Sequence, residues 1–231
     1  MRNSANGTVE CLLLRKAARQ RFGGIWVFPG GAIDEADRVM HAGSAQIDVV
    51  ATAVNAATRE LFEETRLHHR TCLGTAFVSH WMPPDTEARR RGKVFSTFFL
   101  AAELDGNGPA RVDGHEIVGH QWLTPGEGLA LHAEGKLPLL PPTFLTLETI
   151  RSCCAAGRGT AESVVRMLQA SEARTFETRQ GKLPDGRHCF MWAGDSGWAT
   201  SDPTAPGHER FRLTSPAEEP LSALRLELVR T

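Results

Sequence analysis

Apolar runs separated by turn residues predict β-strands along the first half of the chain. The runs 8–16 and 25–30 are joined by a polar stretch with two glycines, which predicts a loop between two strands. A second pair, 72–81 and 93–104, flanks a basic loop that contains two prolines. A further short strand is expected at 116–125.

A change of spacing after Asp48 predicts an α-helix that continues to about Leu67. Apolar residues recur there at intervals of four, three and four, which is the spacing of one helical face. The residues of this stripe are Val50, Val54, Ala57 and Leu61.

Helical spacing returns in the second half of the chain. Predicted helices cover 126–135, 144–157 and 161–173, and the remainder from Arg174 is turn-rich and strand-like. Strands interleaved with a few helices predict an α/β or α+β sandwich with a helical and β-rich C-terminal extension.

The domain organisation follows from the same pattern. We expect one domain over residues 1–150 and an extension over residues 151–231 that packs on its core. The sequence shows no internal repeat and no low-complexity tract.

Composition excludes several classes of function. The 231 residues are 41% apolar and 23% charged, which is typical of a globular protein. The formal net charge of −1 gives no overall field for a nucleic-acid polymer or an anionic membrane surface. No apolar stretch approaches 18 residues, and the five cysteines form no C-x-x-C pair, so we expect free thiols and a cytoplasmic location.

The stretch "RELFEET" carries the strongest chemical signal. Glu60, Glu63 and Glu64 stand at i, i+3 and i+4 and therefore project from one side of the predicted helix. Such like charges repel unless a cation neutralises them, and Mg²⁺ or Mn²⁺ takes carboxylate oxygens as ligands. Arg59 could hold one of these carboxylates by a bidentate contact.

A solvated helix face is the alternative interpretation of these acids, because charge runs are common on helices. The context favours a site. Ala53 and Ala56 lie one and two turns before the acids, and small residues there would leave open space beside them.

A glycine turn precedes the helix. Gly30 and Gly31 directly follow an apolar run and allow tight backbone geometry and the close approach of a ligand or ion. Together, the glycines and the acids resemble the signature of the Nudix hydrolases, G-x5-E-x7-R-E-U-x-E-E-x-G-U with U a bulky aliphatic residue. Gly31 and Asp37 match its first half, with Asp in place of Glu, and the stretch 59–67 matches the second half.

Two departures accompany the resemblance. Twenty-one residues separate Asp37 from Arg59, where the family has seven, so an insertion of fourteen is expected to loop out before the helix. Arg66 replaces the late glycine of the signature. An interrupted signature, with further similarity over about residues 8–150, resembles the coenzyme A diphosphatase-like branch of the family.

The resemblance implies a Nudix-type α/β/α sandwich with a mixed β-sheet and metal-dependent hydrolysis of a pyrophosphate. In that family the substrate is a nucleoside diphosphate linked to another moiety, and the metal is Mg²⁺ or Mn²⁺. By residue-level match, Glu63 and Glu64 would be metal ligands, and Glu60 would be a ligand or orient the attacking water. The carbonyl of Gly30 could add an oxygen. Arg59 and Asp37 would brace the loop against the helix.

Further residues are candidates for catalysis and substrate binding. Many family members take another acid from a later loop, and Glu116 is our candidate, with Asp113 or Glu103 as substitutes. His80 and Trp81 could contact a base or pantetheine unit, with a core position as the alternative for Trp81. The basic residues Arg89, Arg90 and Arg91 could attract a phosphorylated substrate, or could be solvated loop charge.

Two questions stay open at this level. Only seven residues precede the first credible strand, so either the chain begins upstream or an edge strand is absent. A bare sheet edge could pair with a second copy in a homodimer. The substrate could be coenzyme A or acyl-CoA, which we favour, or ADP-ribose, a dinucleotide or a nucleoside triphosphate. A Nudix-fold module that binds a nucleotide metabolite without turnover is the non-enzymatic alternative, and a structural protein with a solvated acidic face is the third.

Overall fold

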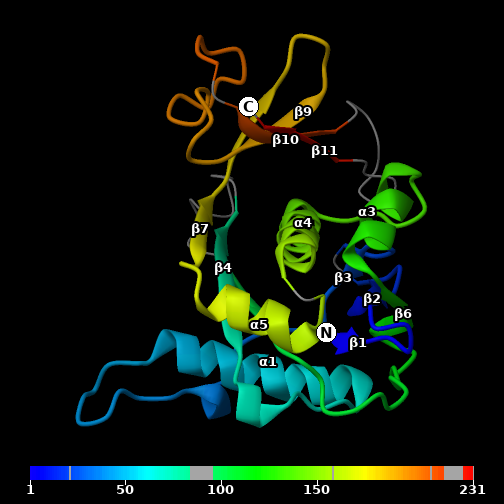
Figure 1. The fold of residues 1–231 in the computed structure, drawn as a ribbon. Coiled ribbons are helices and arrows are strands. Elements are labelled where there is room, and N and C mark those ends of the chain that lie inside the picture. Colours follow the sequence, from blue (N-terminus) through cyan, green and yellow to red (C-terminus); the bar gives the residue numbers. More distant parts are fainter. Residues whose placement is uncertain (21, 84–95, 158, 209, 216–225, 231) are drawn as a thin grey trace.

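Strand β2 (Val9–Lys16) is the central strand of the first sheet. The computed structural model describes residues 1–20, 22–83, 96–157, 159–208, 210–215 and 226–230. In it, β2 pairs antiparallel with its neighbours on both sides. The neighbours are β1 (Arg2–Asn3), β3 (Trp26–Val27) and β6 (Ile117–Leu123), and Figure 1 shows this sheet on the right.

Both faces of β2 are buried, which explains its nearly continuous apolar sequence. Cys11 and Leu13 belong to the larger core cluster, whereas Leu12 and Leu14 on the opposite face belong to a smaller one. The second predicted strand is confirmed only over Trp26–Val27. Pro29 has no N–H to donate and Gly30 has a φ of +154°, so the ladder ends before them.

The second sheet is mixed, as the sequence predicts. β4 (Ala76–Met82) pairs antiparallel with β5 (Thr97–Ala101) and parallel with β7 (Arg174–Glu177). The start of the predicted strand 72–81 instead falls in a 3₁₀ turn, η2 (Thr71–Leu73). Since β7 comes from the C-terminal region, the extension completes this sheet.

Helix α4 (Pro141–Ala156) lies at the centre of the molecule in Figure 1. It packs against α3 (Pro125–Ala133) and α5 (Ala161–Gln169), and α5 packs against β4. Phe144, Leu147 and Ile150 of α4 lie in the larger core. That core continues without interruption into the C-terminal strands, since it includes Trp192 and Leu213.

The C-terminal strands form an antiparallel sheet, which lies at the top of Figure 1. Its order is β11 (Glu227–Arg230), β10 (Phe211–Ser215), β9 (His188–Met191) and β8 (Arg179–Lys182). A buried ion pair between Asp195 and Arg212, with Nε–Oδ2 at 2.6 Å, fastens the loop after β9 to β10. Asp195 also accepts the Phe211 N–H at 3.0 Å.

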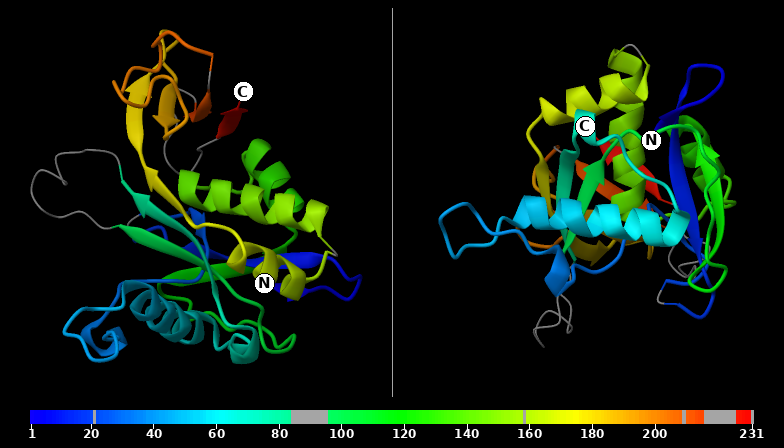
Figure 2. Two further views of the ribbon diagram at one scale, coloured as in Figure 1. Left: turned by 60° about the vertical axis from the view of Figure 1, so that its left-hand side comes forward. Right: turned by 90° about the horizontal axis from the view of Figure 1, so that it is seen from below.

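Helix α1 (Val49–Thr65) crosses one end of the molecule, at the bottom of Figure 1 and in front in the right-hand view of Figure 2. Asp48 caps it by accepting the Ala51 N–H at 2.9 Å. Arg66 ends it in the left-handed region, with φ 61°, which is the conformation that the signature's glycine would favour. The guanidinium of Arg66 lies 5.2 Å from the ring centre of Phe62, a cation–π contact that offsets part of the strain.

Two expectations about the surface of α1 are wrong. Ala53 and Ala56 are buried, 5% and 4% exposed, so they leave no open space beside the acids. Val50 is 41% exposed, so the apolar stripe begins only at Val54.

An absent edge strand was one of two alternatives, and it is wrong because β1 pairs with β2. The Met1 carbonyl accepts the Leu104 N–H at 2.8 Å, which ties this end of the sheet to the segment after β5. The bare edge that motivated a homodimer is therefore covered at this point. All five cysteines are free. Within the described ranges, no helix combines the length and hydropathy needed to cross a membrane.

Candidate active site

The two halves of the sequence signature meet in space where the end of α1 lies against the glycine loop. The backbone N–H of Gly30 donates to Oε2 of Glu64 at 2.8 Å, across 34 positions of the chain. Glu64 is half-buried, and this backbone donor ties the loop to the helix.

Each glycine of the loop has its own physical requirement. Gly30 has a φ of +154°, which L-residues rarely adopt. Gly31 lies so close to the carboxylate of Glu60 that a Cβ atom there would overlap it. The close approach that the sequence predicts is thus made by one of the acids of α1.

Arg59 is the centre of the site's hydrogen-bond network. Its Nε and Nη2 donate to the two carboxylate oxygens of Asp37 at 3.1 and 2.9 Å. Its Nη1 donates to Glu60 at 2.9 Å and to Glu63 at 3.1 Å, and its Nη2 also reaches the Ala32 carbonyl at 2.9 Å. The predicted bracing role of Arg59 therefore has a direct structural basis.

Asp37 ends the short 3₁₀ turn η1 (Glu35–Asp37) and is 4% exposed. The hydrogen bonds from Arg59 lower the pKa of Asp37, and the N–H of Asp34 adds to the effect. Aspartate thus replaces the signature's glutamate while keeping contact with Arg59.

The fourteen-residue insertion loops out as expected. The Asp48 N–H donates to the Val39 carbonyl at 2.8 Å, which closes the base of the loop. The Val39 N–H donates to Oγ1 of Thr52 at 3.0 Å and anchors the loop to α1. Figure 2 shows the loop projecting from the body at the start of α1, so the insertion does not come between the helix and the glycine turn.

Glu64 is the most electrostatically perturbed acid of the site. Burial raises its pKa to about 7, and the negative charges of Glu60 and Glu116 act in the same direction. The Gly30 N–H and the charge of Lys16 oppose this shift. Desolvation of the carboxylate is thus the main cause of the shift.

Of the three candidates for the further acid, Glu116 is the one whose charge raises the pKa of Glu64. Asp113 instead accepts the backbone N–H groups of His115, Glu116 and Ile117, at 2.9, 3.2 and 3.1 Å, and so shapes the turn that carries Glu116. Glu103 is 6% exposed and accepts from Arg70 at 3.1 Å, in a network outside α1.

The predicted substrate-binding residues fall in different environments. Trp81 is 4% exposed and stacks on Phe176, with ring centres 4.1 Å apart, so it has the core position that was its alternative. His80 stacks on Phe98 at 4.4 Å, and its Nε2 is buried without a hydrogen-bond partner in the described parts of the chain. Arg89, Arg90 and Arg91 lie outside the described residues.

The oxygen atoms of this site are of the kind that a hard divalent cation binds. Carboxylates from one helix and a nearby backbone carbonyl are the oxygen ligands that Mg²⁺ and Mn²⁺ prefer. In their present positions, however, no three acidic, His or Cys side chains among the described residues are grouped to hold an ion. Glu60 and Glu63 turn toward Arg59, while Glu64 turns toward Gly30.

Sequence reasoning missed Lys16, whose charge acts on Glu64 from the end of β2. It expected Arg59 to hold one carboxylate of the helix by a bidentate contact, whereas the two-point contact goes to Asp37. Arg59 instead pairs with Glu63 through a single hydrogen bond. The i, i+4 spacing of Arg59 and Glu63 was a signal for that pair.

Comparisons with known proteins identify the family. A family model described as "NUDIX domain" matches residues 2–141. A Nudix hydrolase structure from Alicyclobacillus acidocaldarius is similar, with a TM-score of 0.54 and 21% identity, covering 74% of this chain and 92% of that one. The structure of a MutT Nudix hydrolase from Burkholderia pseudomallei has a TM-score of 0.40 and 18% identity, and the match covers 61% of this chain and 90% of that one. No curated protein matches.

A glycine turn held against an acidic helix by an arginine defines a class of pyrophosphate hydrolases. The chain belongs to the Nudix family, because the family model covers more than half of it. It is accordingly a pyrophosphohydrolase with the α/β Nudix fold, and its substrates are small nucleotide derivatives.

Proposed function

We propose that the protein hydrolyses the diphosphate of a nucleoside diphosphate derivative with Mg²⁺ or Mn²⁺, and that coenzyme A or acyl-CoA is the favoured substrate. The observation that supports this most is the joining of the two signature halves by Gly30–Glu64 and by Asp37–Arg59. Glu64 bonds the loop directly, and Glu60 and Glu63 bond the same arginine that holds Asp37.

Glu60, Glu63 and Glu64 would hold the divalent cation, with the carbonyl of Gly30 as a further candidate. Asp37, Glu60 and Glu63 share the single positive charge of Arg59, so part of the negative charge is left for a dication to neutralise. A bound dication supplies neutralisation of phosphate charge and activation of water. Arg59 already neutralises Asp37 and keeps the loop in place for that binding.

Glu116 is the proposed further acid, as a ligand or as the base that takes a proton from water. Its carbonyl accepts the Ala17 N–H at 2.8 Å, and Gln20 reaches its carboxylate at 3.4 Å. These contacts and the turn shaped by Asp113 fix the backbone of Glu116 while its side chain stays exposed. Arg89, Arg90 and Arg91 would attract the 3′-phosphate of coenzyme A. We also propose a cytoplasmic location and keep His80 as a candidate contact for substrate.

A hydrolysis panel tests the proposal. Product formation from coenzyme A, ADP-ribose, NADH and nucleoside triphosphates would be compared with Mg²⁺ and with Mn²⁺. Glu63→Gln and Glu64→Gln are the loss-of-function variants, and Glu134→Gln on the exposed end of α3 is a matched control. We expect the wild type to hydrolyse coenzyme A and the Glu64→Gln variant to lose this activity. Saturable binding without turnover would favour a non-catalytic module instead.

The basic residues have a separate test. Replacing Arg89, Arg90 and Arg91 by Ala should raise KM for coenzyme A more than for its 3′-dephosphorylated form. Equal changes in KM for the two substrates would refute their role in recognising the 3′-phosphate.

A further inference from the structure

A buried histidine joins the C-terminal sheet to helix α3. His132 lies in the last turn of α3 and is 0% exposed. Its Nε2 accepts the backbone N–H of Leu226 at 2.7 Å, across 94 positions of the chain. Leu226 is itself buried and directly precedes β11, the end strand of the C-terminal sheet. One imidazole nitrogen thus connects the end of the extension to the Nudix domain.

The contacts of His132 determine which of its nitrogens carries the proton. A backbone N–H can only donate, so Nε2 has no hydrogen and the proton of the neutral ring is on Nδ1. Nδ1 lies 3.0 Å from the Leu137 carbonyl, to which it donates. The Leu139 N–H, 3.3 Å from the same nitrogen, finds no lone pair there in this tautomer. The neutral imidazole therefore uses Nε2 as the acceptor for Leu226.

A second proton on the ring is incompatible with this contact. Both nitrogens of an imidazolium are donors, so Nε2–H would face the Leu226 N–H, and a hydrogen bond would become a contact between two donors. Burial lowers the pKa of His132 below its ordinary value of 6.5, and the Leu137 carbonyl acts in the opposite direction. The folded structure therefore favours the neutral ring.

The surroundings of His132 supply no counter-charge for an imidazolium. Among the described residues, no charged group contributes to the shift in its pKa. The charged residues of α3, of the turn after it and of α4 all bond elsewhere: Glu127 to Thr124, Glu134 to Lys136, and Glu148 to Arg151. In β10, Arg212 is paired with Asp195.

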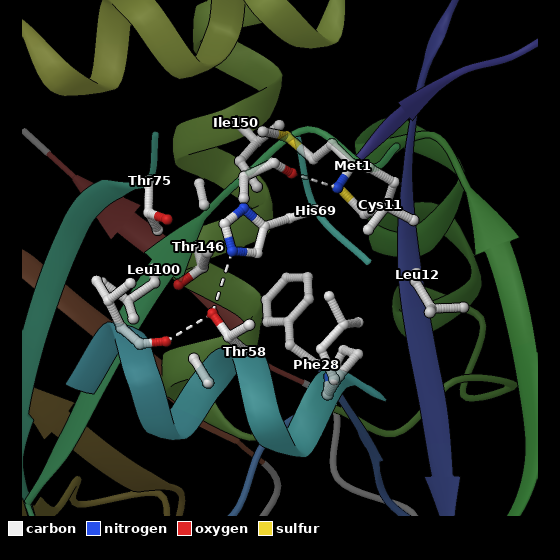
Figure 3. Close-up of a pocket in the computed structure, with 17 residues that line it drawn as sticks. Met1, Cys11, Leu12, Phe28, Thr58, His69, Thr75, Leu100, Thr146 and Ile150 are labelled. Atoms are coloured by element: carbon white, nitrogen blue, oxygen red, sulfur yellow. Dashed lines mark hydrogen bonds between the residues drawn. The ribbon is translucent and has the colours of Figure 1, made fainter. Parts of the chain in front are cut away.

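Helix α4 separates this contact from the signature helix. Phe144 of α4 packs edge-on against His132, with ring centres 5.4 Å apart. Figure 3 shows Thr146 and Ile150, on another side of α4, facing the pocket that α4 and α1 line together. The contact is therefore remote from the acids of α1, and the inference does not depend on the proposed hydrolysis.

We propose that His132 is a pH-sensitive switch for the C-terminal strand β11: the neutral ring holds Leu226 on α3, and the protonated ring releases it. The rest of the C-terminal sheet stays attached through the larger core, which includes Trp192 and Leu213. Acid thus frees one edge of the extension while the Nudix domain stays folded.

The sign of the pH dependence follows from the direction of the shift. Because the pKa of His132 is lowered in the folded state, the contact contributes its full stability above pH 6.5 and loses it as the pH falls below that value. The effect of Glu64 has the opposite sign, since its ionisation opposes folding as the pH rises. The two groups can therefore be distinguished.

Hydrogen exchange of the Leu226 amide measures the switch directly. Its protection factor, corrected for the intrinsic exchange rate, should fall at least about tenfold between pH 7.5 and pH 5, because the released His132 takes up a proton over this range. An NMR titration of the His132 ring in the wild type should give a pKa below 6.5. A ring that titrates at or above 6.5 would overturn the proposal without any variant.

Variants of His132 separate the acceptor from its titration. The side-chain oxygen of His132→Gln can accept the Leu226 N–H and does not titrate, so protection should be equal at both pH values. His132→Met has no such acceptor and should lower protection at both. His120→Gln, at an exposed position of β6, is the matched control and should keep the pH dependence of the wild type.

Two exchange results would each overturn the proposal. One is a wild-type protection factor at Leu226 that is the same at pH 7.5 and pH 5. The other is a His132→Gln variant that loses protection with acid as the wild type does.

Discussion

Asp37 and Arg59 form a two-point ion pair across 22 positions of the chain, with Nε–Oδ1 at 3.1 Å and Nη2–Oδ2 at 2.9 Å. The pair spans the fourteen-residue insertion and holds the end of the glycine loop on α1. A geometry that the family signature achieves with a short connection is here maintained by a side-chain contact.

Removing that contact should loosen the loop. We expect Asp37→Ala to lower both the melting temperature and kcat/KM, because the guanidinium of Arg59 loses its most buried partner. Asp34→Ala is the control, since Asp34 is 64% exposed and lies 3.6 Å from Arg59. Thermal denaturation and steady-state kinetics measure both effects. Equal behaviour of the two variants would contradict the bracing role.

Gly31→Ala should damage activity more than stability. The added Cβ meets the end of the flexible Glu60 side chain, which can move aside and leave its position in the site. A misplacement of about 1 Å can lower catalysis by roughly 100-fold. We expect kcat/KM to fall by about 10- to 100-fold with little change in melting temperature. Gly126→Ala, where a Cβ meets nothing within 4 Å, should leave kcat/KM unchanged.

We expect Glu64→Gln to lower activity and to raise stability, and the gain in stability should depend on pH. Because the pKa of Glu64 is raised to about 7, its ionisation opposes folding increasingly as pH rises from about 4.5 to 7. Neutral Gln avoids this effect and can still accept the Gly30 N–H. Without divalent cation, the variant should gain stability relative to the wild type at pH 8 and lose that gain at pH 5. Hydrolysis should fall by at least about 100-fold.

The measurement is denaturant unfolding at both pH values, with Glu134→Gln as the control. A variant that is equally destabilised at pH 5 and pH 8 would show that burial of the Glu64 charge does not oppose folding.

The Asp195–Arg212 ion pair should stabilise the C-terminal sheet. Asp195→Asn leaves the charge of Arg212 buried without a counter-ion, and breaking such a pair costs about 3–5 kcal/mol. Asp185→Asn, in an exposed pair with Arg187, should change stability little. The free energy of unfolding tests this prediction. Similar losses in both variants would mean that the buried pair is no stronger than an exposed one.

Local periodicity explains how much of the fold was predictable. The 3.6-residue spacing that begins after Asp48 identifies α1 and puts Glu60, Glu63 and Glu64 on one side of it. The parallel pairing of β4 with β7 could not be predicted from local spacing. Ser79 and Arg174 pair with each other, but α4 and α5 lie between them in the sequence, and the packing of these helices brings the two strands together.

The candidate site was predictable as a set of residues but not as a set of contacts. The signature names the glycines and the acids, but the hydrogen bond from the Gly30 N–H to Glu64 was not among the predicted contacts. Which carboxylates Arg59 would engage depends on side-chain rotamers that spacing does not determine. The burial of Trp81 likewise depends on Phe176, a residue nearly a hundred positions away.

The most direct measurement is a Mn²⁺ titration of the purified protein at pH 8, followed by calorimetry or electron paramagnetic resonance. The wild type should bind Mn²⁺ saturably, and Glu64→Gln should weaken that binding at least about tenfold, while Glu134→Gln should not. No saturable binding by the wild type, or equal binding by all three proteins, would contradict a metal site on α1.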